Sequence, residues 1–388
     1  MLNITVKGYR LLSSTGDRFP SLPVLPDELI IEILLRVSVR SLLQFKCVSK
    51  LWNTLISDPK FAKDHFRVSI ADPNMAHQRL VSSGFIGPSK IRSFSTQLLF
   101  QNSPTPAQSH CFPTNANCRI LGSCHGLLCL YDFRNGYVTL WNPSTRLQSE
   151  RLPICGSFTY HGFGYDHLND KYKLLLALKG DTVTKIYTFG PNSFTVIENF
   201  PRQETYPLGW QGKFLKGTLN WISKRKRGDP WVILSLDLGT ETYGEILLPD
   251  GDCKYICKPV LDVLRNCLSV CFFDPIEIHW VLWLMKDYGV RDSWTKLTII
   301  PCHLNHFYQP LCISEDGVVL LTTNCSELVL YNSNDGRFDY LKIKKNCGLH
   351  DRHIYYESLK IYLSSGLDGD LAKVSFESDF SKSSISKK

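Results

Sequence analysis

The sequence lacks long apolar segments. No uninterrupted apolar stretch approaches the roughly 18 residues that a membrane-spanning helix requires. The first part of the chain also has no apolar run behind a basic start, which would mark a secretory signal. We therefore expect a folded protein without a membrane partner, located in the cytoplasm, the nucleus or both.

The motifs of common catalytic sites are missing as well. There is no Gly-x-Ser-x-Gly elbow and no phosphate loop of the form G-x4-G-K-[ST]. Acidic residues lie mostly in stretches such as "SNDGRF" and "LGTETY", where their side chains are expected to stabilise turns. His125 and His161 begin strand-like segments and are expected to satisfy core hydrogen bonds rather than bind a metal. These features predict a non-catalytic chain without a cofactor.

The fourteen cysteines do not have the spacing of a zinc finger. Several, such as Cys124 and Cys129, lie inside apolar strand-like runs, as buried reduced thiols do in cytosolic or nuclear proteins. Zinc binding is the alternative for two C-x3-C spacings, which have no two-residue knuckle and no paired histidines. The four residues concerned are Cys253, Cys257, Cys267 and Cys271.

The net charge of +8 is moderate for 388 residues and partly local. The segment "SKRKRG" at 223–228 and the C-terminal "SKSSISKK" supply a good share of it. A nucleic-acid binder usually has basic residues interleaved with aromatic ones along a whole face. One loop and one tail do not form such a face, so we expect no nucleic-acid partner, although "KRKR" is also compatible with a nuclear-import signal.

The chain after about residue 120 repeats itself with a period near 48 residues. Each unit has an apolar strand, a loop, a second strand, a turn rich in Asn, Asp, Gly or Ser, and usually a closing proline. The middle strands align at positions that differ by 46, 49, 47 and 48 residues: Trp141, Tyr187, Leu236, Trp283 and Tyr331. The closing prolines differ by 48, 48 and 52: Pro153, Pro201, Pro249 and Pro301.

Four short antiparallel strands in about 48 residues make one blade of a β-propeller. An irregular β-sandwich is the alternative, but it would not keep two landmarks in register over five units. Strand-like segments between residues 78 and 100, "QRLVSSGF" and "IRSFSTQLLF", could pair with "HIYYESLKIYLS" at 353–364. Such a composite sixth blade would close the ring and remove its open edges.

Residues 23–66 have helical rather than strand patterning. Three helices are expected, the first opened by Pro26, the second capped by Ser38 and covering "VRSLLQFKCVSKLWNTLI", and the third starting at Asp58 and Pro59. In the first helix one apolar face follows the i, i+3, i+4, i+7 rule. It comprises Ile30, Ile33, Leu34 and Val37, and further apolar residues, Leu29, Ile31 and Leu35, point elsewhere. A module of about forty residues needs a partner surface, which could be the propeller or another protein.

These two parts resemble a plant F-box protein with an F-box-associated, kelch-like interaction domain. The strings "LPDELIIEILLRV", "VRSLLQFKCVSKLW" and "LISDPKF" match the F-box along nearly its whole length. The repeats carry that family's motifs in order, among them "GSCHGLLCLYD", "LWNPSTR", "HGFGYDHLNDKYK" and "GTLNWIS". One departure is Val37, Ser38 and Val39, where the family commonly has Leu-Pro-Val; this could alter affinity for an adaptor.

The resemblance implies an α+β multidomain fold in which a small helical F-box precedes an all-β propeller of about six four-stranded blades. The expected boundaries are a flexible N-terminus at 1–22, the F-box at 23–66, the propeller at 67–368 and a flexible tail at 369–388.

The resemblance also implies that the F-box binds a Skp-type adaptor, and through it a cullin-based SCF ubiquitin ligase, while the propeller holds a protein substrate. By this resemblance, the residues expected at the adaptor interface are Leu25, Pro26, Leu29, Ile33, Leu34, Leu43, Val48 and Trp52. A scaffold that binds its partner without directing ubiquitination is the alternative.

A substrate surface is expected where loops between blades meet loops between second and third strands. In a four-stranded antiparallel blade both kinds of loop emerge on one face. Exposed aromatic and basic side chains are typical anchors of protein interfaces. The candidates, which would favour an acidic partner, are Tyr206, Trp210, Lys224, Arg225, Lys226, Arg227, His306 and Tyr308. The alternative is that the basic loop is only solvated and that some of these aromatic residues belong to the core.

Overall fold

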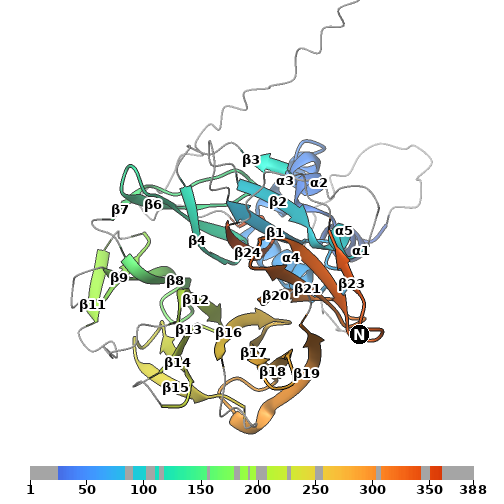
Figure 1. Ribbon diagram of the computed structural model, residues 1–388. Helices are drawn as coiled ribbons and strands as arrows, with labels where there is room; N and C mark the ends of the chain where they lie inside the picture. The colour runs from blue at the N-terminus through green and yellow to red at the C-terminus, as the bar shows by residue number, and fades with distance from the viewer. Residues whose placement is uncertain are drawn as a thin grey trace, which may run out of the picture.

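Figure 1 shows the computed structural model of the chain, in which short helices precede a ring of small sheets. The structure describes residues 25–83, 91–101, 110–112, 118–154, 158–178, 184–190, 193–197, 208–224, 229–249, 257–302, 307–341 and 350–360. The predicted flexible ends at 1–22 and 369–388 lie outside these ranges.

The N-terminal part forms a helical module, which we define as residues 25–71. Its helices are α1 (Asp27–Leu34), α2 (Val39–Phe45), α3 (Lys50–Ser57) and α4 (Pro59–Ala71). Ser38 caps α2 as predicted, since its Oγ accepts a hydrogen bond from the Ser41 N–H at 3.2 Å. The predicted start of the last helix is confirmed too, because Asp58 accepts from the Lys60 N–H at 2.7 Å. The expected domain boundary at residue 66 falls inside α4.

The predicted second helix is in fact two helices. Residues 46–49 interrupt it, and Ser49 adopts an extended backbone conformation with φ −155° and ψ 158°. Its hydroxyl accepts a hydrogen bond from the Trp52 N–H at 3.2 Å and so caps α3. Serine competes with the helical backbone for hydrogen bonds, which makes it a good cap and a poor interior residue. The apolar pattern runs through this position, so the periodicity concealed the break.

Six blades of four strands make up the described part of the propeller, as predicted, and a single parallel pair, Gln211 with His161, joins two neighbouring blades into one eight-stranded sheet. One blade has β4 (Cys118–Cys124), β5 (Leu127–Asp132), β6 (Tyr137–Trp141) and β7 (Leu152–Pro153). The next has β8 (Phe158–Asp166), β9 (Lys171–Leu178), β10 (Thr184–Thr188) and β11 (Ser193–Ile197). It is followed by β12 (Leu208–Leu215), β13 (Thr218–Ser223), β14 (Val232–Asp237) and β15 (Tyr243–Leu247).

Two further blades follow the same plan. The first has β16 (Cys257–Leu264), β17 (Cys267–Asp274), β18 (His279–Met285) and β19 (Trp294–Pro301), with the short 3₁₀ helix η2 (Arg291–Ser293) before β19. The second has β20 (Tyr308–Ile313), β21 (Val318–Thr323), β22 (Leu328–Asn332) and β23 (Phe338–Tyr340). Acidic residues cap many of the turns; Asp274, for example, accepts from the backbone N–H groups of Ile276 and Glu277.

The sixth blade is composite and closes the ring, as predicted. It contains β1 (Gln78–Ser83), β2 (Ile91–Ser95), β3 (His110–Phe112) and, from the other end of the chain, β24 (His350–Tyr356). Two details differ from the prediction. The end of "IRSFSTQLLF" is not a strand but the helix α5 (Thr96–Phe100), capped by Ser95, and β24 ends at Tyr356 rather than continuing to residue 364.

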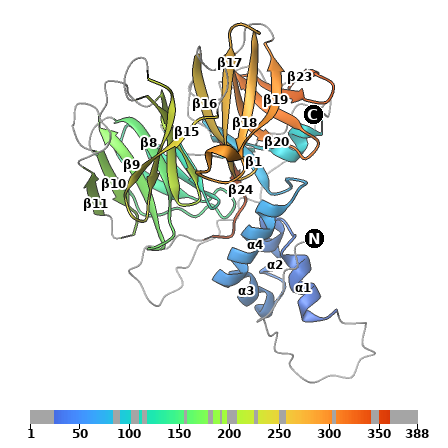
Figure 2. The same cartoon turned by 90° about the horizontal axis from the view of Figure 1, so that it is seen from below.

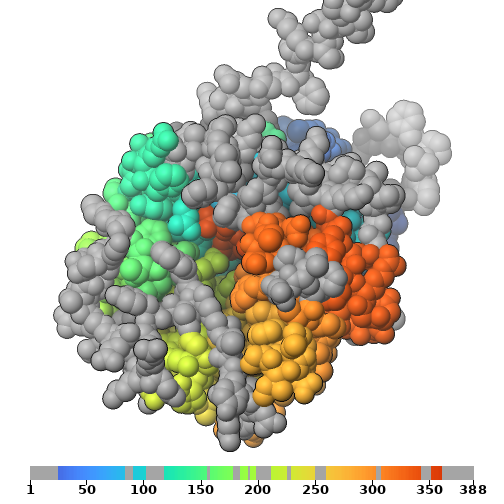
Figure 3. All heavy atoms as spheres, viewed as in Figure 1, coloured from blue at the N-terminus to red at the C-terminus, as the bar shows by residue number. Residues whose placement is uncertain are grey.

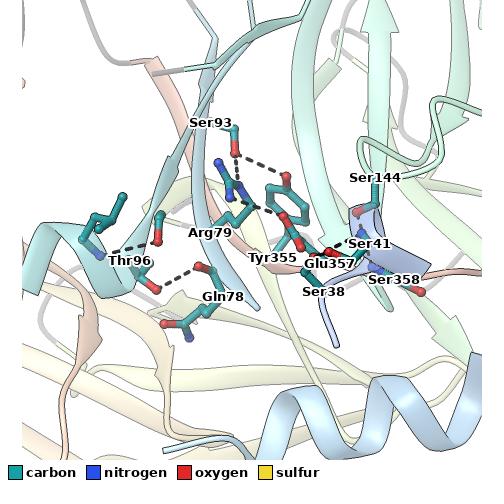
Figure 4. A network of polar contacts seen from close by, with 12 residues as sticks. Ser38, Ser41, Gln78, Arg79, Ser93, Thr96, Ser144, Tyr355, Glu357 and Ser358 are labelled. Carbon is teal, nitrogen blue, oxygen red and sulfur yellow. Dashed lines mark hydrogen bonds and ion pairs between the residues drawn. The ribbon is translucent and has the colours of Figure 1, made fainter. Parts of the chain in front are cut away.

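Polar contacts stabilise the seam of the composite blade (Figure 4). Arg79 of β1 donates from Nε to the Ser93 hydroxyl at 2.7 Å and forms an ion pair with Glu357 at 3.3 Å. Ser93 and the Tyr355 hydroxyl of β24 are 3.3 Å apart. Strands from the two ends of the chain are therefore joined by side chains as well as by their backbone ladder.

The helical module lies on one face of the propeller (Figure 2). The innermost strands β4, β8, β12, β16, β20 and β24 are the ones that contact one another around the ring. The first residue of β1, which follows α4, pairs with the last residue of β24. The module is therefore on the face where the innermost strands end, which we call the helical face. Turns between second and third strands lie on the opposite face.

The segment after β24, residues 357–360, joins the module to the propeller, and we call it the C-terminal strap. Leu359 is 5% exposed and belongs to the core of the helical module. On the propeller side, the Asn142 side-chain amide donates to the carbonyls of Ser358 and Lys360, both at 2.8 Å. Phe66 of α4 also packs edge-on against His125, with ring centroids 5.7 Å apart.

Candidate functional site

The core of the helical module includes only part of the periodic apolar face of α1. Ile31, Leu34 and Leu35 are buried, whereas Ile33 is 52% exposed. Both sets satisfy the i, i+3, i+4 spacing, so periodicity could not decide between them. The remaining core residues come from the other helices and the strap: Val39, Leu42, Leu55, Ile56, Phe61 and Leu359.

Large apolar side chains remain exposed on the same module. Leu25, Leu29 and Ile33 are spaced by four residues and therefore share one side of the chain along α1. Together with Val48 and Leu51 they form what we call the apolar module surface. Their exposed fractions lie between 40% and 65%. Such a cluster on so small a module is typical of a protein interface.

Five of the eight predicted interface residues are exposed. They are Leu25, Pro26, Leu29, Ile33 and Val48. Leu34 is 2% exposed, so it is a core residue and cannot contact a partner. Leu43 and Trp52 are half-buried against the core, and Trp52 packs edge-on against Phe45 with centroids 5.4 Å apart. Leu51 was not predicted to be exposed. It lies in the first turn of α3, and the start of α3 at the Ser49 cap was not recognised from the apolar periodicity.

Five of the eight predicted substrate residues lie outside the described ranges: Tyr206, Arg225, Lys226, Arg227 and His306. The side chain of Trp210, which belongs to β12, lies outside them as well. Lys224 is half-buried, with Nζ 4.1 Å from the centre of the Trp231 ring.

The prediction for Tyr308 is wrong. Its side chain is fully buried and stacks on Phe338, with ring centroids 5.9 Å apart. It begins β20, an innermost strand, so its ring enters the core between blades instead of the surface.

The face opposite the helical module carries exposed apolar residues that sequence reasoning missed. Phe133 lies in the turn between β5 and β6, and Ile276 and Ile278 lie in the turn between β17 and β18. All three are more than half exposed. Both turns connect second and third strands and therefore lie on this face. Figure 3 views the molecule from the same side as Figure 1, and the blue atoms of the helical module are visible only at its rim.

Five of the nine cysteines whose side chains the structure describes are buried. Cys271 is buried in β17, where burial raises the pKa of its thiol and keeps it protonated. Cys267 begins the same strand, and Cys253 lies outside the described residues. Within the described ranges, no three His, Cys, Asp or Glu side chains gather in a metal-binding group. No helix in those ranges is long and apolar enough to cross a bilayer.

Comparisons with known proteins agree with this architecture. The F-box domain model matches residues 22–64, and the F-box associated beta propeller domain model matches residues 85–364. An F-box/kelch-repeat protein of Arabidopsis thaliana is 32% identical over 356 residues, which are 86% of this chain and 95% of that protein. The F-box protein CPR1 of the same plant is 25% identical, with 92% of each chain covered.

Solved structures give a weaker likeness. A chain of the nidogen/laminin complex aligns with 71% of this chain and 98% of its own length, at 11% identity and a TM-score of 0.44, which is too low to support a structural argument. The family assignment rests instead on the two domain models, which together match most of the helical module and nearly the whole ring. The chain therefore belongs to the plant F-box family in which an F-box is followed by an F-box-associated β-propeller.

Proposed function

We propose that the protein is the substrate-recognition subunit of an SCF ubiquitin ligase, in which the F-box binds a Skp-type adaptor and the propeller holds a protein substrate. The observation that carries this proposal is the apolar module surface. The core of the F-box is already complete, because the strap supplies Leu359, and five large apolar side chains still face the solvent. Burying such side chains in an interface contributes about 1.5 to 3 kcal/mol each when it is complete.

The two ends of the proposed assembly lie on opposite faces of the ring. The F-box is on the helical face, and the exposed residues Phe133, Ile276 and Ile278 are on the other. We propose that this opposite face, with the basic segment 224–227, receives the substrate and favours an acidic one. In this arrangement the chain performs no chemistry itself, and a conjugating enzyme recruited through the adaptor and cullin modifies the substrate. The protein would act in the cytoplasm or nucleus, where buried thiols such as Cys271 stay reduced.

The double substitution Leu29→Glu, Ile33→Glu is expected to weaken adaptor binding by at least about 100-fold, because two carboxylates would be buried unpaired in the interface. Both residues are exposed and lie four positions apart on α1, so the fold should be retained. Titration calorimetry with purified adaptor measures the change. Leu168→Glu, which alters a 74% exposed leucine on a propeller turn, is the matched control and should bind like the wild type. Equal affinity of the double variant and the control would refute the adaptor surface.

A second measurement separates a ligase subunit from a scaffold that only binds its partner. Cullin should co-purify with the wild-type chain and not with the Leu29→Glu, Ile33→Glu variant. Proteins captured by the propeller should have longer half-lives in cells that carry the variant. Unchanged half-lives, with cullin present in the wild-type complex, would support the scaffold instead.

A further inference from the structure

A cavity of about 760 Å³ occupies the helical-face end of the propeller channel. The innermost strands form its walls, and the end of α4 with the turn after it, from Ile70 to Met75, forms part of its border. Small-molecule sites commonly have volumes of roughly 300 to 1,000 Å³ and lie at domain interfaces. This cavity meets both criteria, since it lies between the F-box and the propeller.

Most polar side chains of the cavity already have partners. Lys213 and Asp262 form an ion pair at 2.9 Å, and Asp262 also accepts from the Gln309 amide at 3.1 Å. Gln211 is within 2.9 Å of the His353 ring. Burial, reinforced by the nearby charge of Lys213, lowers the pKa of His353 to about 4, so this ring is neutral at pH 7. These groups form a satisfied polar layer and need no ligand.

Arg352 and Gln78, which also line the cavity, have hydrogen-bonding capacity that is not used. Arg352 donates to the Thr322 hydroxyl and forms no ion pair with any described carboxylate. The carboxylate of the neighbouring Asp351 instead forms an ion pair with Arg119 at 2.9 Å and accepts a hydrogen bond from the Ser83 hydroxyl at 2.9 Å. A half-buried guanidinium has five donors and favours a planar carboxylate.

The second unsatisfied group is the amide of Gln78, which is 7% exposed. Its Nε2 is 2.9 Å from the Tyr356 hydroxyl, while its Oε1 has no hydrogen-bond partner. If the amide were turned over, the nitrogen would be left without a partner instead. Leaving a buried polar group unsatisfied costs about 1 to 3 kcal/mol. A ligand group that forms a hydrogen bond with the free Gln78 amide atom would therefore gain binding free energy.

We propose that the cavity binds a small organic acid, with its carboxylate on Arg352, a polar group against the Gln78 amide, and an apolar body against Met75, Phe214 and Leu264. The remaining wall supports this ligand class, because the lining also contains apolar residues such as Phe163, Leu311 and Ile313. The site borders both domains, so an occupied cavity would also strengthen the contact between F-box and propeller. The proposal does not depend on the role in ubiquitination.

The test is a fluorescence titration of the full chain with 8-anilino-1-naphthalenesulfonate, an organic anion with an apolar body. The titration uses the Leu29→Glu, Ile33→Glu protein, so that the apolar module surface does not contribute. One saturable site is expected, and benzoate should displace the probe while neutral benzamide should not.

Variants assign the binding to the cavity. Arg352→Gln should weaken binding of the probe at least tenfold, Gln78→Met should weaken it several-fold, and Arg352→Lys, which keeps the charge, should retain most of it. Arg337→Gln, at an exposed ion pair with Asp339 on the outer strands, is the matched control and should change nothing. Thermal unfolding confirms that each variant is folded. Absence of both probe and benzoate binding in the parent protein, or equal binding by the Arg352→Gln and Arg337→Gln variants, would overturn the proposal and leave a channel that holds water only.

Discussion

Replacing Leu359 with alanine is expected to lower the free energy of unfolding of the F-box by about 2 to 5 kcal/mol, the range for a buried leucine that leaves a cavity. Leu359 is 5% exposed and packs in the F-box core, although it lies near the other end of the chain from the four helices. Leu359→Asp should have a larger effect, because an unpaired carboxylate would be buried there. Hydrogen exchange of α1 to α3, followed by mass spectrometry, measures the local stability.

The reason for so large an effect is that the strap completes a core too small to stand alone. Modules of about forty residues usually need a staple or a partner. The strap is held on the propeller by Asn142, and Lys360 Nζ lies 4.7 Å from the centre of the Tyr165 ring. The F-box should therefore lose stability when the strap is altered, while the blades stay protected. Leu168→Ala is the control at an exposed site. Wild-type exchange in the Leu359→Ala protein would contradict this account.

Replacing Lys173 with methionine is expected to destabilise the propeller by about 3 to 5 kcal/mol at pH 7, as when one partner of a buried ion pair is removed. Lys173 is 6% exposed in β9. Its ammonium group is 2.9 Å from both Asp166 and Glu241 and donates to the Leu238 carbonyl at 2.7 Å. Leu238 and Glu241 follow β14 in the next blade, so this side chain connects two blades. Without it the fully buried Asp166 keeps its charge but loses its cation.

The pH dependence provides a check on this mechanism. Burial alone would raise the pKa of Asp166, but hydrogen bonds from Asn169 and Lys173 hold it below its usual value. Asp166 therefore contributes stability above its unfolded pKa of about 4, and this is lost as the pH falls through the lower folded value. The difference between wild type and Lys173→Met should shrink as the pH falls to about 4 and below, since a neutral carboxyl needs no cation.

Chemical denaturation at several pH values measures that difference. Lys171→Met, two residues away in the same strand and half-buried, is the matched control, and it should remain within about 0.5 kcal/mol of the wild type. A loss for Lys173→Met that is independent of pH would show that packing, rather than the ion pairs, stabilises this contact between blades.

The blades were predictable from sequence because their signal is repeated. Turn residues and apolar strands recur together about every 48 residues, so each repeat supports the strand assignment in the others. The composite blade could be predicted too, because an open ring would leave unpaired strand edges. Short elements that occur only once were harder to predict from the sequence. The helix α5 and the short strand β3 have no counterpart in the repeat, and their local pattern is that of any half-buried segment.

The candidate site was predictable only where the local pattern determines exposure. On α1 nearly every position is apolar, so the choice between Ile33 and Ile31 as core residue depends on the packing of other helices. Leu359 illustrates the same limit. Its segment looks like the end of a strand, and only the tertiary contact with the F-box, more than 280 residues away in sequence, makes it a strap. Tyr308 was misplaced because an aromatic residue next to a loop can face either way.

We propose that the apolar module surface binds the adaptor while the opposite face of the ring stays free. Hydrogen exchange of the full chain, with and without purified Skp-type adaptor, tests it directly. Added protection is expected for the backbone amides around residues 25–33 and 46–51, and none for the turns that carry Phe133, Ile276 and Ile278. Protection of those turns by the adaptor, or unchanged exchange in α1, would contradict the proposal.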